Sequence, residues 1–120
     1  MPDERVTRIV PNLQVADVEE ATRFYADTLG LDIAQRMVWI GTLVAPDSEH
    51  VQLSTITADA TADVTPLVSV GVADVDAAYE RVVRAGAPIV YDLTDEEWGV
   101  RRFFFRDPDG NVINVVAHRD

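Results

Sequence analysis

The tetrapeptide VADV occurs twice, at Val15–Val18 and at Val72–Val75, and the two copies are 57 residues apart in a chain of 120 residues. Each copy stands where the hydrophobic pattern changes its period. A loosely alternating segment rich in β-branched residues precedes each copy and is typical of a strand. Apolar residues at helical spacing follow each copy. A repeat of about half the chain indicates two copies of one small structural unit.

Each VADV predicts a corner at which a strand leads into a helix. Asp17 stands at the N-cap position, and Glu20 three residues later completes a capping box. Asp74 takes the N-cap position in the second copy. Gly30 and Gly86 follow the last apolar residues of the two helical patterns, and glycine at this place ends a helix.

Three strand patterns follow each helix, so the sequence predicts a βαβββ unit written twice. They read DIAQRMVW, IGTLVA and HVQLSTI in the first half, and PIVYDLT, VRRFFFR and NVINVVAH in the second. We expect module one at about residues 5–57, a linker at 58–66 and module two at about 67–118. One helix cannot cover both faces of a sheet, so we expect an α+β fold in which two tandem modules pair into a curved mixed sheet that forms a cleft.

Composition excludes several classes of protein. The chain has no cysteine, which excludes disulfides, thiolate chemistry and zinc–cysteine sites. Its net charge of −11 repels nucleic acid and anionic membranes and attracts cations. No apolar run approaches the length of a membrane span, and the charged start MPDERVTR does not resemble a signal peptide. We therefore expect a cytoplasmic protein with no nucleic-acid or membrane partner.

The stretches NLQVADVEEATRFYADTLGL and FFFRDPDGNVINVV resemble the vicinal oxygen chelate superfamily. This superfamily includes glyoxalase I, extradiol dioxygenases, fosfomycin-resistance enzymes and bleomycin-resistance proteins. The resemblance covers nearly the whole chain and implies the glyoxalase/bleomycin-resistance/dioxygenase fold. Its metal enzymes place one ligand early in the first strand and another on the last strand of each module. Those positions correspond here to Val10, Leu67 and Asn114, together with Gln52 through the separation of 62 residues between the turns APDS and DPDG.

The residues at these positions do not have the chemistry of a metal centre. Val10 and Leu67 have no lone pair to donate, and the amides of Gln52 and Asn114 are weak substitutes for imidazole or carboxylate. We therefore expect neither a metal nor another cofactor. His50 and His118 offer a displaced metal site, although both stand near predicted strand ends.

Without a metal, the predicted cleft becomes a site for a small molecule. Val10 and Leu67 would form an apolar floor, with Gln52 and Asn114 as its polar groups. Trp39 and Trp98 would be its aromatic walls, and the carboxylates of the DEEWG segment beside Trp98 suit a cation. Arg101 and Arg102 alternate in direction, and the sequence leaves open which of them faces the cleft.

Three functions are compatible with these residues. The first is a metal-free protein that sequesters a cationic or aromatic ligand, which resembles the acidic, dimeric bleomycin-resistance proteins and implies a role in antibiotic resistance and a homodimer. The second is a metal-independent isomerase, lyase or epimerase, for which Tyr91 and Glu97 are candidate acid–base groups. The third is a glyoxalase-type metalloenzyme with displaced ligands.

Overall fold

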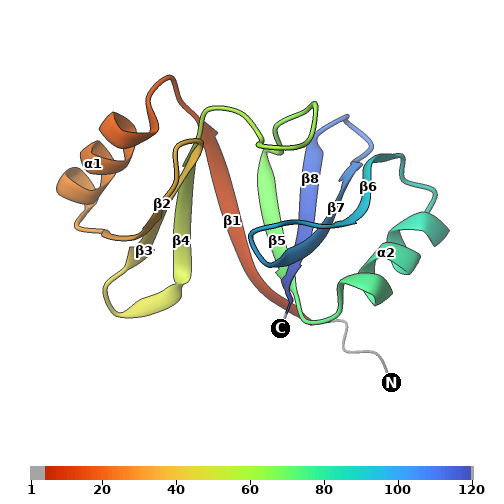
Figure 1. Cartoon of the computed structure of the whole chain (residues 1–120). Coiled ribbons are helices and arrows are strands. Elements are labelled where there is room, and N and C mark those ends of the chain that lie inside the picture. Colours follow the sequence, from red (N-terminus) through yellow and green to blue (C-terminus); the bar gives the residue numbers. More distant parts are fainter. Residues whose placement is uncertain (1–4, 120) are drawn as a thin grey trace. The chain divides into compact units, whose positions relative to one another are not determined.

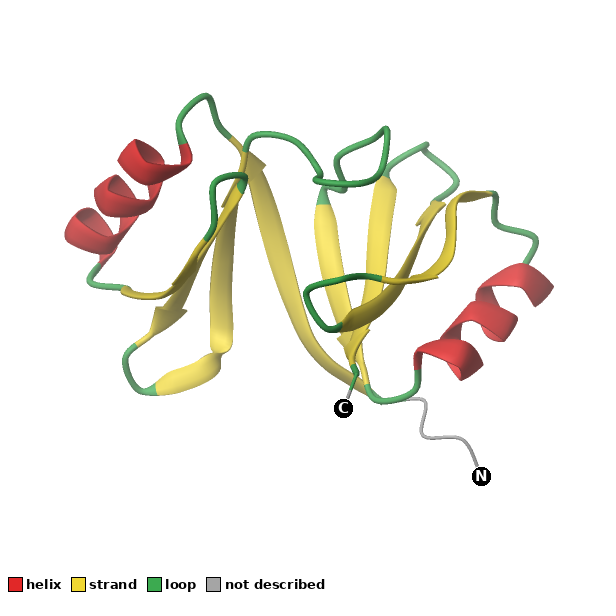
Figure 2. Ribbon diagram, viewed as in Figure 1, coloured by secondary structure: helices red, strands yellow, loops and turns green. Residues whose placement is uncertain are grey.

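The computed structural model describes residues 5–119, and these form a mixed sheet of eight strands with two helices (Figures 1 and 2). The predicted α+β class and the doubled βαβββ order are confirmed. The elements in chain order are β1 (Val6–Gln14), α1 (Val18–Leu29), β2 (Asp32–Arg36), β3 (Ile40–Ala45), β4 (Ser48–Ile56), β5 (Val68–Val72), α2 (Val75–Arg84), β6 (Ile89–Asp95), β7 (Val100–Arg106) and β8 (Val112–His118).

The hydrogen-bonded order of the strands is β2-β3-β4-β1-β5-β8-β7-β6. The chain divides into two compact units, and the division falls within β1. The N-terminal unit comprises residues 10–65, and the C-terminal unit comprises residues 5–9 with 66–119. In each unit the first and last strands of a module pair in parallel, and the remaining strands pair as antiparallel neighbours.

The two helices begin at the residues that the repeat predicts. The Asp17 side chain accepts a hydrogen bond from the backbone N–H of Glu20, and Asp74 accepts one from Ala77 in the same way. Gly30 ends α1 with φ of 70°, a left-handed conformation that glycine adopts without a steric penalty. Neither helix described within residues 5–119 is long and apolar enough to span a membrane.

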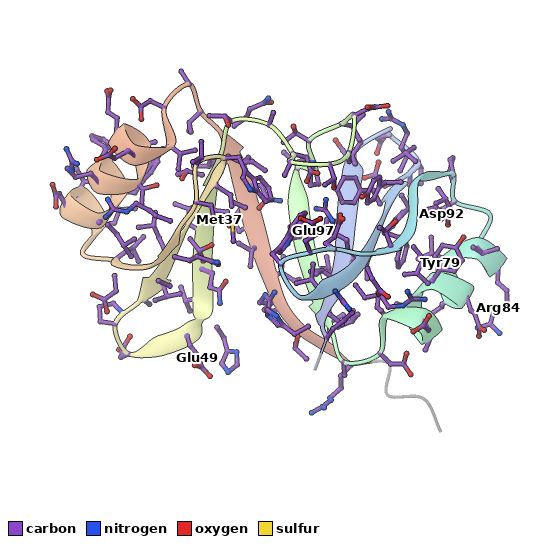
Figure 3. All side chains as sticks on the ribbon, in the orientation of Figure 1. Met37, Glu49, Tyr79, Arg84, Asp92 and Glu97 are labelled. Atoms are coloured by element: carbon purple, nitrogen blue, oxygen red, sulfur yellow. The ribbon has the colours of Figure 1, made fainter. Side chains whose placement is uncertain are left out.

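In the C-terminal unit α2 covers one face of the sheet. The core of this face contains Val72, Val75, Phe103 and Val115, all buried. The ring of Tyr79 meets Phe103 edge to face at 5.0 Å between centroids. Its hydroxyl continues past the core and donates to the Asp92 carboxylate at 2.8 Å (Figure 3), a bond that lowers the pKa of that carboxyl group. Burial of a ring such as Phe103 stabilises the fold by roughly 2–3 kcal/mol.

The N-terminal unit packs its helix with much smaller side chains at the equivalent positions. Thr22 corresponds to Tyr79 in the repeat, and Gly41 corresponds to Phe103 through the strand register. Thr22 is fully buried and shares a hydrogen bond of 2.8 Å with the hydroxyl of Thr55, which is also fully buried. A Cβ atom at residue 41 would overlap Thr22 Oγ1 and lie 2.9 Å from Thr55 Oγ1. This position therefore requires glycine because the helix packs closely against the sheet.

We predict that Gly41→Ala destabilises the protein by about 1–3 kcal/mol, since the added methyl group forces apart a buried and hydrogen-bonded threonine pair. Urea unfolding followed by circular dichroism measures this loss. Ala34→Ser, which adds one atom to the exposed strand β2, is the control and should change the free energy of unfolding by less than about 0.5 kcal/mol. A neutral Gly41→Ala variant would contradict the close packing of α1.

Candidate functional site

The sheet face opposite α2 in the C-terminal unit, called here the non-helical face, carries most of the unit's buried polar groups. Alternation along β7 directs Phe103 and Phe105 toward the helix and Arg102 and Phe104 to the non-helical face. Strand register arranges this face as two rows of cross-strand neighbours. The first row is Ser69, Asn114, Phe104 and Tyr91, and the second is Gly71, Val116, Arg102 and Thr94.

Asn114 is buried on this face with half of its amide unsatisfied. Its Nδ2 donates to Ser69 Oγ at 2.9 Å. Its Oδ1 is shielded from solvent and has no hydrogen-bond partner in the described structure. An unpaired polar atom of this kind costs about 1–3 kcal/mol. Such a cost is uncommon in folded proteins, so the Asn114 amide is a candidate contact for a bound molecule.

Arg102 lies in a cage of aromatic rings closed by a carboxylate. Its Nε donates to Glu96 Oε2 at 2.6 Å, and both side chains are about 95% buried. The Tyr91 hydroxyl donates to the same oxygen at 2.8 Å. The guanidinium carbon lies 4.8–5.2 Å from the ring centroids of Phe104, Trp98 and Tyr91, within the range of cation–π attraction. The cluster is therefore a neutral, hydrogen-bonded ion pair.

This cage explains why the DEEWG segment, with an indole beside three carboxylates, has the composition of a cation-binding site. An indole beside carboxylates was expected to hold a cation, and the structure places the chain's own Arg102 against Trp98. Arg101 points toward α2, where it pairs with Asp76 and Asp95 at 2.9 and 3.0 Å. Of the two arginines, Arg102 thus belongs to the non-helical face. Its placement as a ligand-binding residue stays a prediction.

The N-terminal unit has a related pair of polar residues. Asn12 of β1 is registered with Ser54 of β4, and both are buried. Ser69 is the repeat equivalent of Asn12, so the register makes Ser54 the counterpart of Asn114, with a separation of 60 residues. The separation of 62 residues, from which Gln52 was predicted as the counterpart of Asn114, holds for the turns APDS and DPDG but not for strands β4 and β8. The cause is a shift in the β3–β4 register between Val44 and Ala45, which β7–β8 lacks.

The other sequence-predicted site residues are distributed over both units. Val10 is buried and Gln52 half-buried in the N-terminal unit, where Gln52 Nε2 donates to the Glu49 carbonyl at 2.7 Å. Trp39 is half-buried between β2 and β3. Leu67, 54% exposed, immediately precedes β5. The register and the cage bring Asn114, Arg102 and Trp98 onto one face, and the roles of all these residues stay predictions.

Three polar residues on the non-helical face were not predicted as site residues. Ser69, Glu96 and Arg8 supply, respectively, a hydroxyl, a buried carboxylate and a half-buried guanidinium to this face. Arg8 was detectable in principle, because it precedes Val10 by two residues and strand alternation gives them one direction. The partner of Ser69 comes from a distant part of the chain, and the partners of Glu96 lie five and six residues away on the two strands that flank its turn, so no spacing motif marks either residue.

The donor set at the metal positions of the fold does not fit a divalent cation. The four positions carry Val10, Ser54, Leu67 and Asn114: two aliphatic side chains, one hydroxyl and one neutral amide. Divalent ions in proteins are held mainly by carboxylate or imidazole, and one amide with one hydroxyl does not compensate for the loss of their water. Within residues 5–119 no group of three or more histidine, aspartate or glutamate side chains is placed to hold an ion. His50 and His118 are both exposed.

The family model of the Glyoxalase/Bleomycin resistance protein/Dioxygenase superfamily matches residues 5–115, and the chain belongs to this superfamily. The resemblance drawn from the sequence motifs is thereby confirmed. No curated protein matches the chain.

Solved structures with the same fold cover almost the whole chain. A Legionella pneumophila protein described as an NAD-dependent benzaldehyde dehydrogenase aligns with a TM-score of 0.74 at 15% identity, over 92% of this chain and 99% of that one. A variant of Streptomyces coelicolor methylmalonyl-CoA epimerase, in complex with 2-nitronate-propionyl-CoA, aligns at 0.69 and 19% over 98% and 99%. The Mn(II)-bound glyoxalase from Novosphingobium aromaticivorans aligns at 0.62 and 22% over 97% and 39%. At these identities the likeness shows the fold alone.

We predict that Arg102→Met destabilises the protein by about 3–5 kcal/mol, because it leaves the Glu96 carboxylate buried without its guanidinium. Arg101→Met is the control: its ion pairs are partly exposed and should contribute less than about 1 kcal/mol. The double variant Arg102→Met/Glu96→Gln should recover part of the loss. Urea unfolding measures all three, and equal effects of the two single variants would contradict the cage.

We predict that the protein does not bind metal stoichiometrically. After incubation with Zn²⁺, Ni²⁺, Fe²⁺ or Mn²⁺ and desalting, elemental analysis should find far less than one ion per chain, because Val10 and Leu67 offer no donor. Retention of one ion together with a higher melting temperature would refute the donor-set argument.

Proposed function

We propose that the protein is a metal-free small-molecule binding protein of its superfamily, which sequesters an aromatic ligand at the non-helical face of the C-terminal unit. One observation carries the proposal. Asn114 is buried at a metal-ligand position of the fold, and its amide oxygen lacks a hydrogen-bond partner. The unpaired amide oxygen lowers the stability of the fold, and a ligand that donates a hydrogen bond to it would restore this free energy on binding.

The surroundings of Asn114 support a binding role. Ser69, which holds the Asn114 amide, is half-buried, so a bound molecule can reach the pair from the Ser69 side. Trp98 is also half-buried, and the exposed part of its indole can stack on an aromatic ring. Apolar surface with a few oriented polar groups is the usual composition of a small-molecule site.

The geometry favours binding over the alternative of a metal-independent isomerase, lyase or epimerase. Such an enzyme needs a general base that is able to receive a proton. Glu96, the buried carboxylate described on the non-helical face, accepts hydrogen bonds at Oε2 from both Arg102 and Tyr91, so this oxygen is already occupied by donors of the chain. Glu97 is exposed in the turn between β6 and β7 (Figure 3). The expectation of a homodimer stays a prediction.

We predict that Asn114→Leu combined with Ser69→Ala leaves the melting temperature unchanged or higher and weakens ligand binding at least tenfold. The double substitution removes both hydrogen-bonding partners together with the unpaired atom, which is close to neutral for stability. It also removes the polar groups that a ligand needs. Chemical-shift titration with neutral, anionic and cationic aromatic compounds measures binding, and a bleomycin-type glycopeptide belongs to the panel.

The matched control is Thr22→Val combined with Thr55→Val. It removes a buried hydroxyl pair from the N-terminal unit and should change stability without changing affinity. A large loss of stability in the Asn114/Ser69 variant with unaltered affinity would show that the pair is structural and would overturn the proposed function.

A further inference from the structure

Arg8 lies across the backbone of β5 on the non-helical face. A Cβ atom at residue 71 would come within 2.8 Å of Arg8 Cγ and 3.3 Å of Arg8 Cζ. Residue 71 is therefore glycine for a steric reason: only a residue without a side chain leaves room for the arginine. The guanidinium group is thus held over the sheet, next to the second row of the face, in which Gly71 is registered with Val116.

Arg8 is a half-buried residue and, within the described residues 5–119, no hydrogen-bond acceptor or carboxylate pairs with its guanidinium group. The two arginines of β7 that lie nearest the site differ in this respect. Arg101 pairs with two aspartates and Arg102 with Glu96. The chain contains 21 acidic residues against 10 basic ones, so carboxylates are abundant. A cation on a half-buried residue that lacks a partner among the described residues, in so acidic a chain, points to an external anion.

Arg8 and the Asn114–Ser69 pair lie two residues apart along β5, which is the distance between successive side chains on one face of a strand. Gly71 lies under Arg8, and Ser69 precedes it by two residues on the same face of β5. Two residues along a strand span roughly 6.6 Å. A molecule of a few bonds can therefore contact the guanidinium at one end and the Asn114 amide at the other.

Arg8 gives the described groups of the non-helical face a net positive charge. The Arg102–Glu96 pair is neutral as a whole, so it leaves Arg8 as the uncompensated charge of the groups described here. The cage of Trp98, Tyr91 and Phe104, which suits a cation, is already filled by Arg102. A cationic ligand on this face would find the aromatic cage already occupied by Arg102, and Arg8 would repel it.

We propose that the ligand of the non-helical face is a small organic acid that also carries an O–H or N–H donor. Its carboxylate binds the Arg8 guanidinium, which suits planar carboxylates as a forked donor. Its donor satisfies Asn114 Oδ1, the unpaired acceptor. This inference rests on the proposed function, since it names the class of ligand that binds at the same site.

Four aryl probes separate the two contacts. Mandelate carries both a carboxylate and a hydroxyl donor, O-methylmandelate lacks the donor, styrene glycol lacks the charge, and phenylethanolamine replaces the anion with a cation. Isothermal titration and chemical-shift titration should give mandelate at least a tenfold higher affinity than each of the other three. Phenylethanolamine should bind most weakly.

Substitutions at Arg8 provide the decisive comparison. Arg8→Gln should lower the affinity for mandelate to that for styrene glycol and leave styrene glycol unchanged, and Arg8→Lys should restore part of the preference. Arg84→Gln, which removes an exposed cation of α2 (Figure 3), is the matched control and should have no effect. Circular dichroism confirms that each variant is folded.

The outcomes distinguish this inference from the proposed function. Binding that depends on Asn114 but is equal for mandelate and phenylethanolamine, or unaffected by Arg8→Gln, overturns the organic-acid inference and leaves the proposed function standing. An absence of binding by all four probes, and by the wider aromatic panel, overturns both. The predicted order of affinities supports both.

Discussion

The structure depends on one constraint: each module has two sheet faces and only one helix to cover them. In the C-terminal unit α2 covers the face that carries Phe103 and Val115, and the face behind it must be stabilised differently. Burial of polar groups on that second face is tolerated only when they are paired, because an isolated buried charge costs several kcal/mol. The Arg102–Glu96 pair within its aromatic cage meets this requirement. Asn114 meets it only in part, because its Oδ1 has no hydrogen-bond partner among the described residues.

The repeat preserves the backbone but not the interior. The same helix–sheet contact is made by Tyr79 against Phe103 in the C-terminal unit and by Thr22 against Gly41 in the N-terminal unit. The polar pair at the parallel strands also persists, with asparagine and serine exchanged between the partners. The two copies of the βαβββ unit therefore make the same helix–sheet contact with very different side-chain volumes, and the small residues of the N-terminal unit let its helix pack closely against the sheet.

The fold was predictable from sequence because its signals are local. The N-caps at Asp17 and Asp74 and the alternation of the strands lie within a few residues of the elements that they define. The candidate site was predictable only in part. Asn114 was predicted from the resemblance to the superfamily and Trp98 from the DEEWG insertion, whereas the pairing of Arg102 with Glu96 depends on how the β6–β7 turn folds back. The register of β4 was predicted two residues away from its structural value, because the shift near Val44 cannot be read from the spacing of turns.

In the organic-acid proposal, local geometry is weighed against composition. A net charge of −11 favours cations at long range, and that reasoning led from the sequence to a cationic ligand. Ionic screening limits such a field to about 8–10 Å in physiological salt. At the non-helical face the closest charges decide, and there Glu96 is already neutralised by Arg102 while Arg8 has no described counterion. Under the organic-acid proposal, the acidic surface acts on encounter and Arg8 acts in recognition. The proposed anion would gain a guanidinium partner for its carboxylate, and its donor would meet the amide oxygen of Asn114 that has no described partner.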